Sequence, residues 1–313
     1  GLRTRMPVRG RDGLVEVRSA GAKGRVSACG PDRADPAEYD LVALAMQEPQ
    51  YRLSGVRELL ERVAQSRTPA MSIMNMPPLP YLARLPGVNV ATLRDCYADP
   101  AAWDGFDPAL VTLASPDPQA FRPADAPANL LQVSLPTNFK VAAFADPRHT
   151  AMLRRIEADI QAVRFDPGGG PVELPVKLRV HDSVFVPLAK WAMLLTGNYR
   201  CVTPEGPRSI RDAVHSDPDA SRAVYDWVRQ VCMALGAAEA DLVPFEKYAA
   251  AAEGLVKPSS AVRALHGGAP FIERVDRLVQ RLAAGRDMRN ETVDRTVALV
   301  DAQLERNGQE AAV

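Results

Sequence analysis

One asparagine stands out among the side chains that could do chemistry. Asn75 comes directly after the short apolar run 70–74 and is followed by a proline-rich stretch at 77–80. A run of this length is typical of a buried strand, and a polar residue at its end is poorly explained as part of the core. Ligands of α/β sheets bind beyond the carboxyl ends of the strands. We therefore interpret Asn75 as a residue that contacts a bound ligand.

The sequence contains no glycine-rich motif of the kind that binds a dinucleotide. Such a motif, G-x-G-x-x-G after the first strand, lets the backbone approach the pyrophosphate closely. Gly21-Ala-Lys-Gly24 lacks this spacing, and Gly168–Gly170 follows a long helical pattern instead of opening one. The residues alone thus indicate a two-domain protein without an assigned function.

Composition argues against several classes of partner. Lys+Arg and Asp+Glu are balanced at 38 each, whereas proteins that bind nucleic acid usually carry an excess of basic charge. No apolar run approaches the roughly 18 residues that span a bilayer. The cysteines and histidines are dispersed, so we predict neither a metal site nor a disulfide framework. We expect a cytoplasmic protein with a small-molecule ligand and no nucleic-acid or membrane partner.

The first half of the chain alternates between strand-like and helix-like patterns. This alternation favours an α/β domain with a mainly parallel sheet. Pro136-Thr-Asn138 reads as a hairpin turn between two of the strands. The expected strands are 40–46, 70–74, 88–93, 110–114, 130–135 and 139–144, and the expected helices are 56–63 and 152–163.

A break at Asp166–Pro171 predicts a domain boundary near residue 170, with domains at 1–170 and 171–313. Beyond it the apolar pattern is helical, so the second domain is predicted to be all-α. Ser216 should cap a helix that stops at Gly236, and further helical stripes cover 272–282 and 293–304.

Several segments, taken in order, resemble the ketopantoate reductase (2-dehydropantoate 2-reductase) family. The first includes the run Asp40–Tyr51, and the second ends in the strand-end asparagine of Ser72–Met76. The resemblance extends over roughly residues 1–307, and its segments are 40–51, 72–76, 131–144, 185–198, 257–260 and 267–276.

The resemblance implies a fold and an activity. The fold is a Rossmann-type NADP-binding domain followed by a helical domain of the 6-phosphogluconate dehydrogenase C-terminal type, which binds substrate and dimerises. The first strand and the glycine-rich loop are expected upstream of Gly1. The activity is the NADPH-dependent reduction of a small 2-keto acid to the 2-hydroxy acid, as in pantothenate biosynthesis, by a homodimer.

The resemblance also assigns a catalytic pair. Hydride transfer to a 2-keto acid leaves charge on the carbonyl oxygen, where a cation or an acid must meet it. The resemblance assigns this role to Lys190 and makes Glu273 its charge partner. Without the resemblance, Lys190 would be a surface lysine beside Trp191, and Glu273 an exposed helix acid pairing with Arg274 or Arg277.

Two alignments of the lysine helix stay open. The family pattern is W-x-K-L-x-x-N, and alignment on Lys190 puts Leu188 at the tryptophan and Leu194 at the asparagine. Alignment on Asn198, the other candidate for substrate binding, removes the lysine from the pattern altogether.

The remaining site residues are assigned to substrate and cofactor. Ser259 or Ser260 would bind a substrate carboxylate or hydroxyl, although either could instead cap a helix. Asn75 would reach nicotinamide and substrate together, and Met46 and Gln47 would rim the cleft beside the cofactor. Gln47 stands where many family members have a lysine, which weakens the case for ketopantoate itself.

Two other functions compete with this one. An opine-type dehydrogenase has the same architecture but tends to use a histidine as acid or base, and no histidine lies at a matching helix position here. A non-catalytic dimeric binding protein could keep the scaffold without the nucleotide loop. The missing loop also predicts that this chain binds NADPH weakly or not at all.

Overall fold

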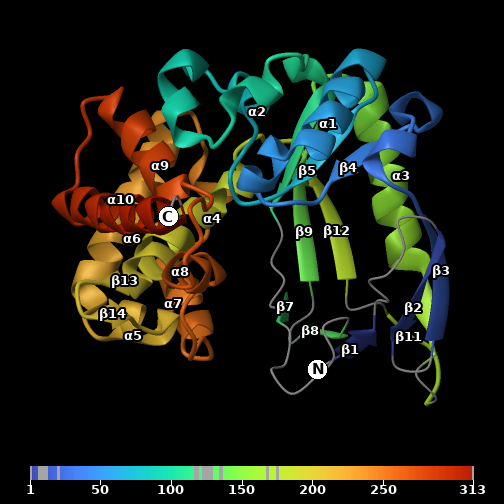
Figure 1. Cartoon of the computed structure of the whole chain (residues 1–313). Helices are drawn as coiled ribbons and strands as arrows, with labels where there is room; N and C mark the ends of the chain where they lie inside the picture. The colour runs from blue at the N-terminus through green and yellow to red at the C-terminus, as the bar shows by residue number, and fades with distance from the viewer. Residues whose placement is uncertain are drawn as a thin grey trace.

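An α/β part and a helical part lie side by side in the computed structural model (Figure 1). The structure describes residues 2–5, 13–19, 22–115, 120–121, 130–133, 137–166, 169–173 and 176–311. The predicted combination of an α/β half with a helical half is confirmed.

The main sheet has five strands in the order β12-β9-β6-β5-β4. Neighbours β4, β5 and β6 run parallel, as do β9 and β12, whereas β6 and β9 are antiparallel. Every residue of β6 is buried, as expected for a strand covered on both faces. The bounds are β4 Val42–Leu44, β5 Ala70–Ile73, β6 Val111–Ser115, β9 Thr137–Ala142 and β12 Val176–His181.

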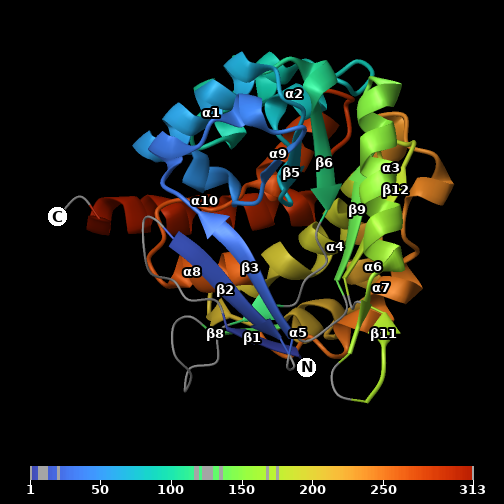
Figure 2. The same ribbon diagram turned by 90° about the vertical axis from the view of Figure 1, so that its right-hand side faces the viewer.

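Two helices cover opposite faces of this sheet (Figure 2). Side chains alternate between the faces along a strand, so Ala70 joins the core beneath α1 and Met71 the core beneath α3. Helix α1 (Ser54–Ser66) buries Leu60 and Val63, and helix α3 (Pro147–Ala162) buries Leu153. The α1 core continues without a break into the helical part, so the two parts are packed together.

The strand predicted at 88–93 is wrong. Residues Val90–Cys96 form a 3₁₀ helix within a crossing from β5 to β6 that also contains α2 (Leu79–Leu82). Asn89 starts this helix, because its side chain accepts a hydrogen bond from the Ala91 amide at 3.1 Å. Only Leu93 and Cys96, three residues apart, are buried, which suits a helical turn better than a strand.

The predicted hairpin around Pro136–Asn138 is also wrong. Strand β8 belongs to a second, antiparallel sheet of order β3-β2-β1-β8-β7, whereas β9 belongs to the main sheet. The turn residues 134–136 lie outside the described residues. Both strands pair with distant segments, which a local turn signal does not reveal. The second sheet contains β1 Leu2–Arg5, β2 Gly13–Ser19, β3 Ala22–Ala28, β7 Ala120–Phe121 and β8 Leu130–Val133.

The main sheet includes β12 although this strand follows the predicted boundary. Around the glycine-rich break, β10 (Arg164–Phe165) and β11 (Val172–Glu173) form a short antiparallel pair. The chain then returns as β12 beside β9. The division into two domains stays a prediction, and this sheet places any boundary after His181 instead of near residue 170.

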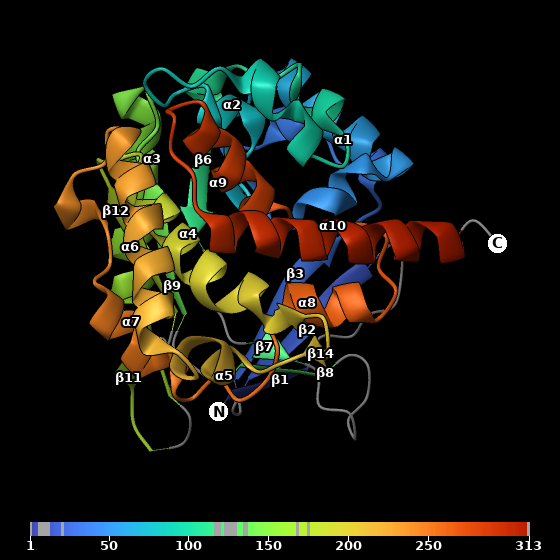
Figure 3. The same cartoon turned by 90° about the vertical axis from the view of Figure 1, so that its left-hand side faces the viewer.

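The second half is helical apart from one small hairpin, β13 (Val202–Thr203) with β14 (Gly206–Pro207). Asp217, not Ser216, caps α6 by accepting from the Ala220 amide at 3.0 Å, and Gly236 follows its end at a φ of +114°. Figure 3 shows α10 as the long helix crossing this part. None of the described helices, α10 included, is long and apolar enough to cross a membrane. The bounds are α4 Lys190–Met193, α5 Ile210–His215, α6 Pro218–Ala234, α7 Phe245–Ala252, α8 Ser260–His266, α9 Val275–Ala284 and α10 Glu291–Ala311.

The helix that carries Lys190 is held against α7 by a close approach. Helix α4 runs directly into a π-helical turn at Leu194–Asn198. Tyr248 of α7 packs against Gly197 in that turn and donates a hydrogen bond to the Met193 carbonyl at 3.1 Å. A side chain at Gly197 would place its Cβ 1.9 Å from the Tyr248 hydroxyl oxygen, so only glycine permits this contact.

Candidate active site

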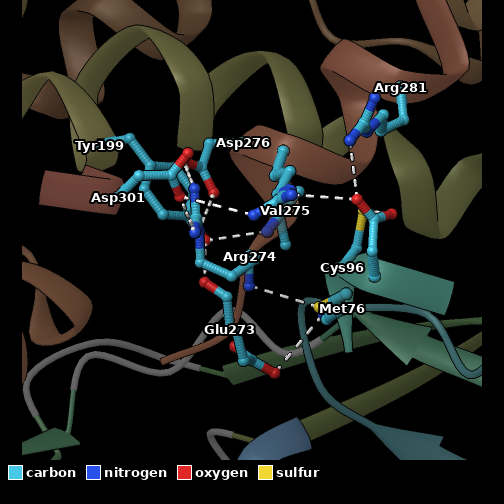
Figure 4. Close-up of polar contacts among 11 residues, drawn as sticks. Met76, Cys96, Tyr199, Glu273, Arg274, Val275, Asp276, Arg281 and Asp301 are labelled. Atoms are coloured by element: carbon cyan, nitrogen blue, oxygen red, sulfur yellow. Dashed lines mark hydrogen bonds and ion pairs between the residues drawn. The ribbon is translucent and has the colours of Figure 1, made fainter. Parts of the chain in front are cut away.

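Asn75 and Glu273 meet where the main sheet faces the helical part. The Asn75 amide nitrogen donates to Glu273 Oε2 at 3.3 Å, and the Met76 backbone amide donates to Glu273 Oε1 at 3.5 Å. The Arg274 amide reaches Met76 Sδ at 3.3 Å. The segment that enters α9 is thus joined to the residues that follow β5, as Figure 4 shows for Met76 and Glu273.

Glu273 is a buried acid whose carboxyl group feels the charge of Lys190. Glu273 is only 7% exposed, and burial raises the pKa of its carboxyl group above the ordinary glutamate value. The hydrogen bonds from Asn75 and Met76 and the positive charge of Lys190 act in the opposite direction. The structure therefore groups Lys190, Asn75 and Glu273, while their roles stay predictions.

The exposed-acid interpretation of Glu273 is wrong. Glu273 lies just before α9 and not on it, and the Arg274 side chain pairs with two other acids. Arg274 binds Asp276 through two hydrogen bonds of 3.0 Å each and also pairs with Asp301. Arg277 pairs with Asp95 and Asp301.

The backbone around Glu273 is fixed from both sides (Figure 4). The Tyr199 hydroxyl donates to the Glu273 carbonyl oxygen and accepts from the Val275 amide at 3.1 Å. Tyr199 is wholly buried, and burial raises its pKa far above the ordinary tyrosine value, so it stays a neutral donor. These contacts hold the Glu273 carboxylate against Asn75.

Glu48 is a second buried carboxyl group at this site, and the sequence analysis missed it. It lies in the 3₁₀ turn Glu48–Arg52 that follows β4, and it is only 2% exposed. Its Oε1 accepts a hydrogen bond from the Ala98 amide at 3.0 Å. Burial, with the charge of Glu273 as a further cause, raises the pKa of Glu48 to about 7. The available signal was an acid in the turn that follows β4, on the side of the sheet where ligands of α/β folds bind.

Two buried acceptor atoms of this group have no hydrogen-bond partner among the described residues. They are Asn75 Oδ1 and Glu48 Oε2. An unsatisfied buried polar atom costs about 1–3 kcal/mol, so proteins rarely keep one without a reason. A bound ligand that donates a hydrogen bond would satisfy such an atom.

The serines have a structural role here. Ser259 is the N-cap of α8, since its Oγ accepts from the Val262 amide at 3.2 Å. The same hydroxyl donates to the backbone carbonyl of Asn198 at 3.0 Å. Ser260 is exposed and is the first residue of α8. The capping interpretation of Ser259 is confirmed, and substrate contacts of Ser259, Ser260 and Asn198 stay predictions.

Met46 and Gln47 lie between β4 and the turn that contains Glu48. The Met46 amide donates to the Tyr51 hydroxyl at 3.2 Å, and the Gln47 amide donates to Gln50 Oε1 at 3.0 Å. Gln47 is exposed and Met46 is half-buried against the core. Their contact with a cofactor stays a prediction.

Within the ranges that the structure describes, no group of three or more His, Cys, Asp or Glu side chains is arranged to hold a metal ion. The arrangement instead combines one lysine charge, one amide and two buried carboxyl groups. Such a group can bind a small polar ligand and supply or accept a proton.

No model of a known protein family matches the chain, and no curated protein matches it. Solved structures do match. A D-mandelate dehydrogenase with NADH and anilino(oxo)acetate has a TM-score of 0.60 at 10% identity, over 92% of this chain and 84% of that one. A dimeric ketopantoate reductase from Staphylococcus aureus has a TM-score of 0.57 at 13% identity, with the same coverages of 92% and 84%.

A third structure, a putative ketopantoate reductase from Ralstonia solanacearum MolK2, has a TM-score of 0.59 at 15% identity and covers 92% of this chain. That match spans 84% of the Ralstonia chain. At such low identity the likeness shows a shared fold. The fold implied by the resemblance, a Rossmann-type part followed by a helical part, is thereby confirmed.

Proposed function

We propose that this chain, which has the fold of ketopantoate reductases and of D-mandelate dehydrogenase, is an oxidoreductase that reduces a small 2-keto acid with NADPH. One observation carries the proposal: Asn75 at a strand end donates a hydrogen bond to the buried Glu273, whose pKa is lowered by the charge of Lys190. The resemblance assigned these same residues to the reaction. Fold neighbours with NADH and with a keto acid analogue support the class of cofactor and substrate.

The nicotinamide end of the cofactor fits this site better than the phosphate end does. Asn75 Oδ1 is a buried acceptor without a partner in the described part of the chain, and the carboxamide of nicotinamide is a matching donor. For the pyrophosphate, the sequence has no G-x-G-x-x-G segment. The coenzyme, when bound, supplies the hydride.

The chain's own residues handle the proton and the charge. Lys190 donates a proton to the carbonyl oxygen as negative charge develops there. Glu273 keeps the lysine protonated between turnovers, and the Asn75 amide orients the ligand. Burial of Glu273 strengthens its interaction with Lys190 because water screens the two charges less.

Cofactor binding gives a direct test. Titration of the chain with NADPH and NADH, followed by coenzyme fluorescence, is expected to show weak binding, because the phosphate-binding backbone motif is missing. Submicromolar affinity would mean that we have misplaced the cofactor site.

Turnover is then measured at coenzyme concentrations high enough to offset weak binding, with a panel of small 2-keto acids. Formation of a 2-hydroxy acid, followed by chromatography, supports the proposal. Ligand binding without any hydroxy acid product would favour the non-catalytic binding protein.

We further infer that the chain forms a homodimer through its helical part. A ketopantoate reductase with the same fold is dimeric. Exposed apolar side chains such as Met233 and Val256 lie on this part. A cytoplasmic location is also proposed, on the resemblance alone.

A further inference from the structure

The strongest unexplained feature of the site is its second buried carboxyl group. Glu48 and Glu273 come from opposite ends of the chain and are both almost fully buried. The charge of Glu273 helps to raise the pKa of Glu48, whereas the Glu48 backbone and the charge of Lys190 both lower the pKa of Glu273. The site thus holds two acids close to one lysine charge.

Two ionised carboxyl groups cannot share such a site cheaply. Burial disfavours each charge, and like charges disfavour each other, so a pair of this kind keeps one proton between its members. Lys190 can balance one carboxylate but not two. One of the two glutamates is therefore protonated.

The hydrogen bonds indicate which glutamate keeps the proton. Glu273 accepts from the Asn75 amide and the Met76 backbone, and both bonds stabilise its ionised form. Glu48 accepts from the Ala98 amide on Oε1, and the Asp99 backbone lowers its pKa more weakly, while Oε2 has no hydrogen-bond partner among the described residues. A proton on Oε2 removes the charge and turns this acceptor into a donor.

We propose that Glu48 is a positioning residue that holds a proton in the site and leaves Glu273 as the single carboxylate facing Lys190. This inference rests on the proposed function, because it assigns Glu48 an effect on the lysine that donates the proton. Glu48 does not itself contact the reacting atoms; it acts by controlling the charge around Lys190.

Burial raises the pKa of Glu48 to about 7, so Glu48 titrates near neutral pH. Asp99 is paired with Arg57, and the Tyr51 and Tyr97 hydroxyls have pKa values raised by burial, so both tyrosines stay neutral. The charges of Glu273 and Asp99 raise the pKa of Glu48, and the charge of Lys190 lowers the pKa of Glu273. Loss of the Glu48 proton adds a second negative charge to the site, which holds the proton on Lys190 more tightly and weakens this lysine as a donor.

The test is the pH profile of keto acid reduction in the wild-type chain and in Glu48→Gln, which keeps the shape of the neutral acid. Wild-type kcat is expected to fall by about tenfold per pH unit above roughly pH 7, since the active form is lost there. The kcat of Glu48→Gln should no longer show this fall above pH 7, whatever its value at lower pH. Glu58→Gln, at an exposed position on α1, is the matched control and should show the same fall in kcat above pH 7 as the wild type.

A second measurement does not depend on activity. Folded Glu48 keeps a proton that the unfolded chain releases above its ordinary pKa, so the wild-type melting temperature should fall as pH rises from 5 to 8. Glu48→Gln should show a smaller fall. Equal slopes in the two proteins would overturn the inference even if no substrate is turned over.

Infrared spectroscopy covers the case in which Glu48→Gln does not fold. The wild-type protein should show a protonated carboxyl band at pH 6 that disappears by pH 8. Absence of this band at pH 6 would refute the proton on Glu48 and leave the proposed function intact. Failure of hydroxy acid formation with the band present would instead count against the proposed function alone.

Discussion

Replacement of Lys190 by methionine is expected to lower the turnover of keto acid reduction by roughly 10²–10⁴-fold, the usual loss for a positioned proton donor. Methionine has a similar length and keeps the contacts of the side-chain stem, but it carries no proton to give. Coenzyme binding should change little, because Lys190 is assigned to the carbonyl oxygen. The kcat and the coenzyme affinity are to be measured on the same preparation.

Lys247→Met is the matched control, since Lys247 is an exposed lysine on α7. It should leave kcat unchanged. An unchanged kcat in Lys190→Met as well would contradict the catalytic assignment. The alignment through Asn198, or the non-catalytic binding protein, would then become the better account.

Local patterns in the sequence were enough to identify much of the main sheet. The strands at 42–44, 70–73 and 111–115 are short apolar runs, and such runs are visible without knowledge of their partners. The strand predicted at 88–93 failed because Asn89 caps a helical turn. The hairpin failed because β8 and β9 each pair with segments distant in the sequence.

The candidate site shows the same division between local and distant information. Asn75 could be identified because its place after a strand is a local feature. Glu273 could be assigned only through the family resemblance, since its burial depends on Met76, nearly two hundred residues away in sequence. Glu48 was missed because its place after a strand does not by itself show that its side chain is buried beside Glu273.

The second large effect is expected for Arg274→Leu, which should destabilise the fold by about 3–5 kcal/mol. Arg274 is the cation that neutralises Asp276, a residue with 0% exposure, and it also pairs with Asp301. Its loss leaves the buried Asp276 carboxylate without a neutralising cation. Urea unfolding at pH 8 measures the change, and Arg277→Leu is the control. Arg277 is partly exposed, so its loss should cost at most about 1 kcal/mol.

The pH dependence of this penalty identifies its cause. Burial raises the pKa of Asp276 and Arg274 lowers it, so removal of Arg274 raises this pKa further. Folded Asp276 then keeps a proton that the unfolded chain releases above its ordinary pKa, and the variant loses stability relative to wild type as pH rises. The penalty should accordingly be smaller at pH 5 than at pH 8. The double variant Arg274→Leu/Asp276→Leu should recover much of the loss, because an apolar pair leaves no buried charge. A penalty that is the same at both pH values and persists in the double variant would mean that lost packing, not the unpaired charge, destabilises the fold.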